Sequence, residues 1–153
     1  MSKLSDYQII GQVYANQNIL IQRARCLRTE QFVLLISINT NSQTTKYLYQ
    51  FTYAYELLKR FEHRNIITVL DWIDSETNPL MVVEDQGSIG LKSYLAEEKN
   101  KLLPISTCFK IASQISDALS EVHHDGIILN NLHTENIMIN PESKQIKLFD
   151  FAF

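Results

Sequence analysis

The chain has 153 residues, enough for one ordinary domain, and 45% of them are hydrophobic, enough to build a core. Fourteen basic against seventeen acidic residues give a net charge of −3, so no overall basic field favours nucleic acid as a partner. Cys26 and Cys108 form no CxxC pattern, which indicates reduced thiols rather than a disulfide framework or a zinc site. No apolar run reaches the length of a membrane span, and we expect a soluble cytoplasmic protein.

The first half of the chain predicts a five-stranded antiparallel sheet with one helix. Runs rich in Ile, Val, Leu and Tyr, separated by polar turns, are typical of strands. These runs lie at 7–13, 19–27, 32–38, 69–73 and 80–84. A helix is predicted over 45–61, because its apolar and aromatic residues recur with the spacing of one buried stripe. The stripe consists of Leu48, Phe51, Tyr55 and Leu58.

The second half predicts mainly helices followed by a hairpin. A flexible crossing at 86–90 precedes a short amphipathic helix at 91–98. A long helix then runs from Pro104 to about Asp125, with Ser106 as a plausible N-cap. One face of this helix carries Ile111, Ile115, Ala118, Leu119 and Val122. The runs 138–140 and 145–149 predict a hairpin that delivers Asp150.

The stretch 126–152 carries the most specific spacing. Asn136 follows Asn131 by five residues, and Asp150 closes a second apolar run fourteen residues later. A protein kinase spaces its catalytic loop and metal-binding loop in this way, and the chain resembles a Ser/Thr-type protein kinase domain. The resemblance implies an α+β fold in one incomplete domain, 1–153, with an N-lobe at 7–85 and part of a C-lobe at 89–153. The segment 136–152 also looks like the amino-terminal kinase-like domain of large bacterial sensor histidine kinases.

The resemblance fails at the catalytic base. Asn131 stands where the family has the aspartate that accepts the proton of the substrate hydroxyl. An amide cannot act as a base, so a factor of roughly 10²–10⁴ in rate is at risk. His133 falls where Ser/Thr kinases usually have the lysine that contacts the γ-phosphate. It is either a weak cation there when protonated or a solvated loop residue.

The resemblance holds at the metal ligands. Asn136 and Asp150 match the family residues that hold Mg²⁺ against the phosphates of ATP. Ala152 replaces the glycine of the Asp-Phe-Gly motif, which narrows the backbone angles available there. Alternatively, Asn136 and Asp150 persist as hydrogen-bonding residues alone, because two oxygen ligands without a phosphate cradle make a poor magnesium site.

The phosphate-binding residues of the family are replaced. The glycines of the lid fall on Tyr14, Asn16 and Ile19. The strand lysine falls on Ser37, and a shift of one or two residues does not supply a cation. The helix glutamate that pairs with this lysine in the family falls on Ala54, so both members of the ion pair are replaced.

The adenine-binding positions are compatible with a purine. Ile21 matches the adenine-facing valine of the family, and Val83 matches the gatekeeper. Glu84, Asp85 and Gln86 fall on the hinge, where backbone groups bind the base and side-chain changes are tolerated. The cofactors implied are ATP and Mg²⁺, bound weakly or not at all.

These positions favour a pseudokinase-like signalling or interaction module. Two alternatives stay open: an active Ser/Thr protein kinase, and the kinase-like part of a sensor kinase split from its other domains. A third reading is the remnant of a truncated gene. Because the chain ends before the later C-lobe helices of a kinase, we expect the stripe from Ile111 to Val122 to be exposed. Such a patch predicts self-association, a protein partner or a separate chain that supplies the C-lobe.

Overall fold

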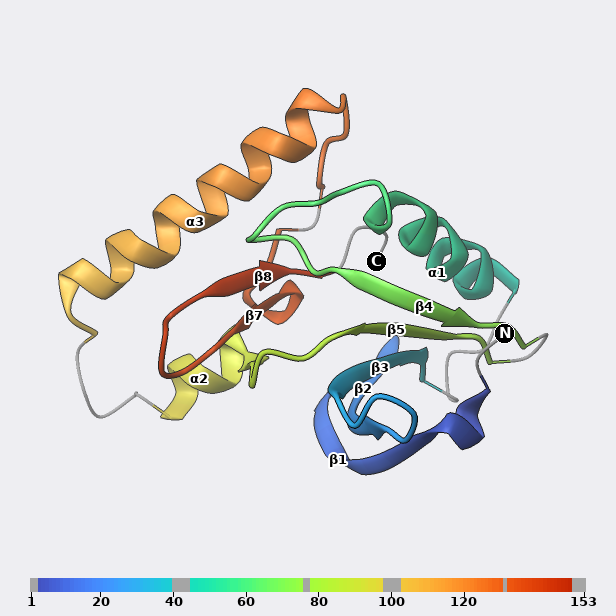
Figure 1. The fold of residues 1–153 in the computed structure, drawn as a ribbon. Coiled ribbons are helices and arrows are strands. Elements are labelled where there is room, and N and C mark those ends of the chain that lie inside the picture. The colour runs from blue at the N-terminus through green and yellow to red at the C-terminus, as the bar shows by residue number, and fades with distance from the viewer. Residues whose placement is uncertain (1–2, 40–44, 76–77, 98–102, 131, 150–153) are drawn as a thin grey trace. The chain divides into compact units, whose positions relative to one another are not determined.

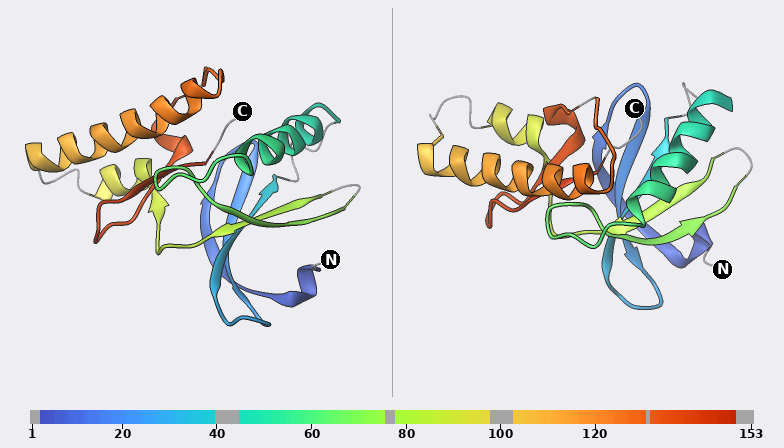
Figure 2. Two further views of the ribbon diagram at one scale, coloured as in Figure 1. Left: turned by 45° about the horizontal axis from the view of Figure 1, so that its top comes forward. Right: turned by 90° about the horizontal axis from the view of Figure 1, so that it is seen from above.

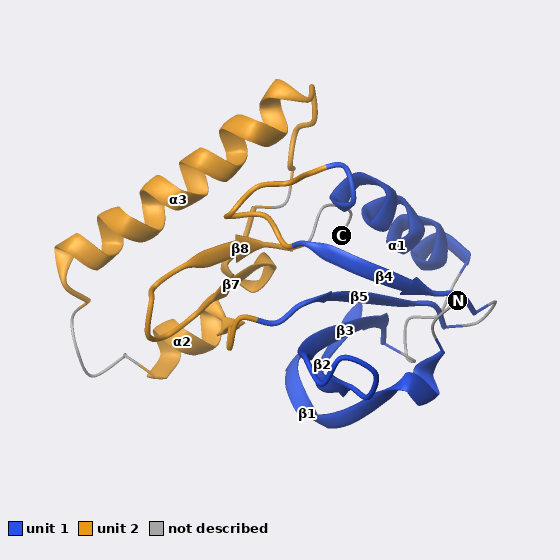
Figure 3. Cartoon of the chain, viewed as in Figure 1, with its two compact units in different colours: residues 1–60, 68–85, 152–153 blue, residues 61–67, 86–151 orange. Residues whose placement is uncertain are grey.

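The computed structural model describes residues 3–39, 45–75, 78–97, 103–130 and 132–149, and they form two compact units (Figure 3). The first unit comprises residues 1–60, 68–85 and 152–153. The second comprises residues 61–67 and 86–151. The turn at 61–67, which the sequence analysis placed in the first lobe, thus belongs to the second unit.

The first unit is a five-stranded antiparallel sheet with the order β1-β2-β3-β5-β4 and one long helix (Figure 1). Its elements are the 3-10 turn η1 (Leu4–Asp6), β1 (Tyr7–Ala15), β2 (Ile19–Cys26), β3 (Phe32–Ile38), α1 (Thr45–Leu58), β4 (Val69–Ile73) and β5 (Leu80–Glu84). This arrangement confirms the α+β fold class and the five-stranded sheet predicted from the sequence.

The helix α1 covers one face of this sheet, which we call the α1 face (Figure 2). Trp72 of β4 stacks on Phe51 and Tyr55 of α1, with ring centroids 5.5 and 4.5 Å apart. Trp72 pairs with Met81 of β5, and Met81 pairs with Ile36 of β3. Because directly opposite residues of paired strands project to one side, these residues mark the α1 face.

The opposite face has an apolar core of its own. Alternate residues of the same strands point there, because side chains alternate along a strand with a period of two. Tyr7 packs against this buried cluster. Its members are Ala24, Val33, Leu35, Ile73, Leu80 and Val82.

The second unit combines two helices with a three-stranded sheet of order β6-β7-β8. Its elements are β6 (Ile89–Gly90), α2 (Leu91–Glu97), α3 (Ile105–His124), the 3-10 turn η4 (Thr134–Asn136), β7 (Ile137–Ile139) and β8 (Ile146–Leu148). The long helix starts at Ile105 with Pro104 as its N-cap, so the prediction of Ser106 as N-cap is wrong. Proline suits this boundary because its fixed φ and missing N–H are tolerated there.

The predicted exposure of the α3 stripe is observed only in part, because Ile115 and Leu119 are half-buried. Ile111, Ala118 and Val122 are buried, because α3 packs against β8 and the hairpin occupies that side of the helix (Figure 2). The exposed large apolar side chains of α3 are instead Ile105 and Phe109, at 74% and 69% exposure. Among the described residues, no helix is long and apolar enough to cross a membrane.

Asn65 anchors the turn 61–67 inside the second unit. Its side chain is fully buried, and its Nδ2 donates to Gln114 Oε1 of α3 at 2.9 Å and to the Ile146 carbonyl at 3.1 Å. The backbone also takes part, because Leu148 N donates to Asn65 O at 2.8 Å and Ile67 N donates to Leu148 O at 2.9 Å. One side chain thus joins the turn, the long helix and the hairpin.

Asn65→Ala should lower the free energy of unfolding by about 1–3 kcal/mol, because it removes two hydrogen bonds and leaves a buried carbonyl with one donor fewer. Urea denaturation measures this. Arg64→Ala is the matched control: Arg64 forms an exposed ion pair with Asp117, and its loss should cost less than about 1 kcal/mol. Equal losses in the two variants would show that Asn65 is not an anchor.

Candidate functional site

The turn that follows α3 leads to His133, one of the predicted nucleotide-contacting residues. Helix α3 ends at His124, and Gly126 follows it with a φ of 74°, which is favourable for glycine. Ile127 N donates back to Val122 O at 3.1 Å. His133 then caps η4, and its Nδ1 accepts a hydrogen bond from Glu135 N at 3.4 Å. Asn131 lies outside the described residues.

Asn136 is the one of the two predicted metal ligands that lies within the described residues. It is buried at the end of η4 and leads directly into β7. The pairing of Ile137 with Leu148 brings the hairpin ends together, and Phe149 N donates to Asn136 O at 3.3 Å. Phe149 precedes Asp150, which lies outside the described residues. Among the residues that the structure does describe, no three His, Cys, Asp or Glu side chains gather into a metal-binding group.

The turn between β1 and β2, which corresponds to the kinase lid, is closed by the side chain of Asn16. Asn16 Oδ1 accepts from the backbone N–H groups of Asn18 and Ile19, each at 2.8 Å. Asn39 Nδ2 donates to Asn16 O at 2.8 Å and ties the turn to the end of β3. The two amides are already hydrogen-bonded inside the turn. A phosphate group would have to displace Asn16 to reach them.

The pairing of β3 revises the position of the missing lysine. Ser37 pairs with Leu20 and Leu80 and therefore lies on the opposite face of the sheet from α1. Its neighbour Ile36 pairs with Ile21 and Met81 and therefore lies on the α1 face. In a kinase the strand lysine reaches a glutamate on this helix, so Ile36 fits the lysine position better than Ser37. Both residues are buried and uncharged, and no cation is available at either position.

On α1, the residue at the glutamate position is Ala54, which is buried. The nearest acidic residue, Glu56, is exposed and pairs with Lys59 at 2.8 Å. Its hydrogen bond raises the pKa of Lys59. Glu56 is therefore engaged on the solvent side of the helix.

The predicted adenine-binding positions divide between the two units. In the first unit, Ile21 and Val83 are fully buried and share the α1 face. Glu84 pairs with Thr68: Glu84 N donates to Thr68 O and Thr68 N donates to Glu84 Oε1, each at 3.1 Å. In the second unit, Gln86 O accepts a hydrogen bond from Asn140 Nδ2. The backbone of Glu84 and the carbonyl of Gln86 thus already have partners within their own units.

Asp85 lies between Glu84 and Gln86 and is held by an ion pair that was not predicted from the sequence. Arg23 of β2 donates through Nε and Nη2 to the two carboxylate oxygens of Asp85, with Nη2 to Oδ1 at 3.1 Å. The Asp85 side chain is only 2% exposed. Arginine suits this contact because its planar guanidinium matches both carboxylate oxygens. The partners lie 62 residues apart, and no local pattern links them.

The five-stranded sheet with its helix, and the turn and hairpin that carry Asn136, are the elements expected of a kinase-like fold. The model of the protein kinase domain family matches residues 17–153, and the chain belongs to this family.

The curated relatives are much longer than this chain. It is 29% identical to "Serine/threonine-protein kinase TIO" of Arabidopsis thaliana, over 98% of this chain and 11% of that protein. It is 28% identical to "Cyclin-dependent kinase 4" of Xenopus laevis, over 95% and 48% respectively. It is 30% identical to "Serine/threonine-protein kinase pkn3" of Myxococcus xanthus, over 85% and 24%. The chain thus spans less than half the length of each.

A double-mutant cycle tests which β3 residue faces α1. Ile36→Lys should destabilise the fold, because it places an unpaired charge in the core. Adding Ala54→Glu should recover more than about 1 kcal/mol of this loss, since both residues lie toward the same interface. The matched cycle of Ser37→Lys with Ala54→Glu should show a coupling near zero. Urea denaturation measures both cycles, and a larger coupling for Ser37 would overturn the revised position.

Proposed function

We propose that this chain is a pseudokinase-like signalling or interaction module, which binds ATP weakly at most and does not transfer a phosphoryl group. The observation that carries the proposal is the closed turn between β1 and β2. Kinases use the backbone amides of this turn to approach the phosphates. Here two of these amides donate to Asn16 Oδ1.

The absence of the charge pair supports the same proposal. Ile36 and Ser37 on β3 and Ala54 on α1 are all uncharged and buried. Without the strand lysine, no side chain at these positions neutralises the α- and β-phosphates. Asn131 in place of the catalytic aspartate removes the base as well.

The proposed partner is a protein. Ile105 and Phe109 stand one helical turn apart at the amino end of α3 and are both exposed. Large apolar side chains that adjoin in this way on a surface are typical of interaction sites. The partner would bind this end of the helix.

The second candidate is an active Ser/Thr protein kinase. Family membership favours it, since the family generally uses ATP and Mg²⁺. It is also favoured by the buried Asn136, whose carbonyl is bonded to Phe149 N next to Asp150. In such an enzyme, Asn136 and Asp150 would hold Mg²⁺ while other residues replaced the missing lysine and base.

Thermal melts with and without Mg-ATP separate the two candidates. A nucleotide at ten times its Kd adds about 1.4 kcal/mol, or about 3–5 °C in Tm for a chain of this size. We expect a rise of less than about 1 °C at millimolar Mg-ATP. Incorporation of γ-phosphate into a generic basic protein should equal that of the Asp150→Ala variant.

A Mg²⁺-dependent rise in Tm of several degrees, together with incorporation that Asp150→Ala abolishes, would establish the active kinase and refute the proposal. A small rise that requires Mg²⁺ and is lost in Asn136→Ala, without incorporation, would support weak nucleotide binding by a pseudokinase.

A further inference from the structure

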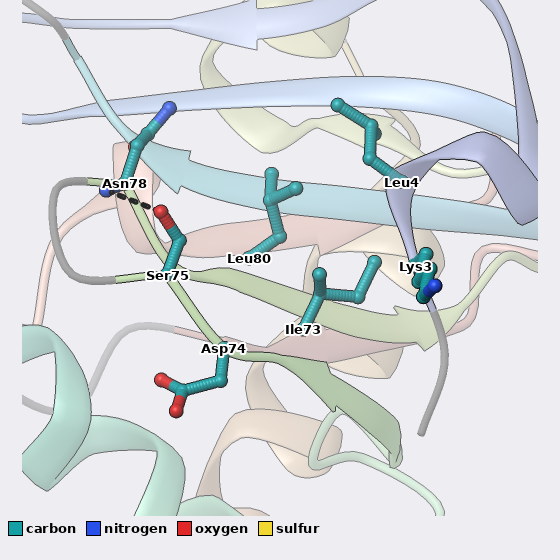
Figure 4. A pocket seen from close by; sticks show the side chains of 7 residues that line it. All are labelled: Lys3, Leu4, Ile73, Asp74, Ser75, Asn78 and Leu80. Carbon is teal, nitrogen blue, oxygen red and sulfur yellow. Dashed lines mark hydrogen bonds between the residues drawn. The ribbon is translucent and has the colours of Figure 1, made fainter.

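A pocket of about 550 Å³ opens in the first unit, between η1 and the connection from β4 to β5 (Figure 4). Its floor is apolar, because Ile73 and Leu80 belong to the buried cluster on the opposite face of the sheet. The carboxylate of Asp74 points away from this space (Figure 4). Such a lining accepts apolar groups in general and selects no class of ligand.

A smaller pocket, of about 280 Å³, lies in the second unit and has a polar lining. The turn at 61–67, helix α3 and the turn between β7 and β8 surround it. None of the candidate nucleotide-binding residues lines it, so a ligand here would go beyond the proposed function. Five of the described residues line it, and none of the five is acidic: Arg64, Lys110, Gln114, Ser143 and Gln145.

Hydrogen bonds hold the walls of this polar pocket in place. Gln114 Nε2 donates to the carbonyls of Lys110 and Lys144, at 3.0 and 2.9 Å, and so joins α3 to the turn after β7. Gln145 Nε2 donates to Arg64 O at 3.0 Å, which joins the start of β8 to the turn at 61–67. The three segments are thus fixed around the pocket without a ligand.

The side chains of the lining retain donors for a ligand. Arg64 donates through Nη2 to Asp117 at 3.0 Å, which among the described residues leaves Nε and Nη1 to donate elsewhere. Lys110 Nζ carries three hydrogens and uses one for Ser143 O, at 2.8 Å. The Ser143 hydroxyl accepts from the backbone N–H of Gln145 at 3.2 Å and keeps its own hydrogen. An acceptor ligand is therefore favoured.

The charges favour an anion. Arg64 and Lys110 bring two positive charges, and the Asp117 carboxylate offsets one of them only in part, because this ion pair is exposed at 71% and 49%. The donors come from three segments, and the oxygens of a tetrahedral anion point in different directions. One such anion can accept from all three, whereas a planar carboxylate presents only one edge. We propose that this pocket binds a phosphoryl group, either as a free phosphate ion or on a phosphorylated side chain.

Titration of the ¹⁵N-labelled chain with sodium phosphate, followed by NMR, tests the site. Sodium chloride keeps the ionic strength constant, so that general screening does not change. At about pH 7.5, where a phosphoryl group is mainly dianionic, we expect saturable shifts at millimolar phosphate, confined to the amides of 64, 110, 114 and 143–145. Acetate is the planar, singly charged control and should bind at least about fivefold more weakly.

Variants separate the pocket from general attraction of anions. Arg64→Gln and Lys110→Gln each remove one cation at an exposed position and should weaken phosphate binding at least about fivefold. Asp117→Asn keeps the shape of the side chain, removes the competing carboxylate and should strengthen binding at least about twofold. Lys46→Gln, which removes an exposed cation of α1, is the matched control and should leave binding unchanged.

A capped glycyl-phosphoseryl-glycine peptide distinguishes the two sources of the phosphoryl group. Tighter binding of this peptide than of phosphate would assign the pocket to a phosphorylated protein, and weaker binding would assign it to the free ion. No saturable shifts with either ligand, shifts outside the pocket, equal binding of acetate, or unchanged binding in both Arg64→Gln and Lys110→Gln would each overturn the proposal.

Discussion

The alternation of side chains along β3 is the constraint on which the first unit depends. This strand is central, with β2 on one side and β5 on the other. Its successive residues supply the α1 face and the opposite core in turn, so a register shift of one residue would exchange the two cores. Because of the same alternation, Ile36 lies on the side of the sheet that α1 covers and Ser37 lies on the other side. Where an active kinase places a buried ion pair, this chain buries aliphatic carbon, an exchange that is often neutral or stabilising.

In the turn between β1 and β2, as on β3, the chain's own side chains occupy the place where a kinase has groups that serve the nucleotide. A glycine-rich lid leaves its amides to the ligand, whereas Asn16 satisfies two of them from within the turn. An asparagine that bonds the backbone two and three residues ahead stabilises a tight turn without glycine. The Arg23–Asp85 pair similarly fixes the segment after β5. Both features favour a fold that is complete without a nucleotide, which is what an interaction module requires.

Much of this fold was predictable from the sequence, and the exceptions have physical causes. The family and the five strands follow from ordered spacings and from apolar runs between polar turns, and the bounds of β3 were predicted as observed. The sequence did not show which residues of β3 face α1, because the strand carries apolar residues on both of its faces. The N-cap of α3 was misassigned because Ser106 has the commoner capping side chain. The Arg23–Asp85 pair and the bonds of Asn65 join residues distant in sequence, and only the fold brings them together.

We infer that the turn at Asn16 is closed to phosphate. The most direct measurement is an NMR titration of the ¹⁵N-labelled chain with Mg-ATP that follows the amides of Asn18 and Ile19. Because these N–H groups already donate to Asn16 Oδ1, we expect both signals to stay in place at millimolar Mg-ATP. Saturable, Mg²⁺-dependent shifts of both amides, weaker with AMP than with ATP, would show that phosphate displaces Asn16 and that the turn is open to nucleotide.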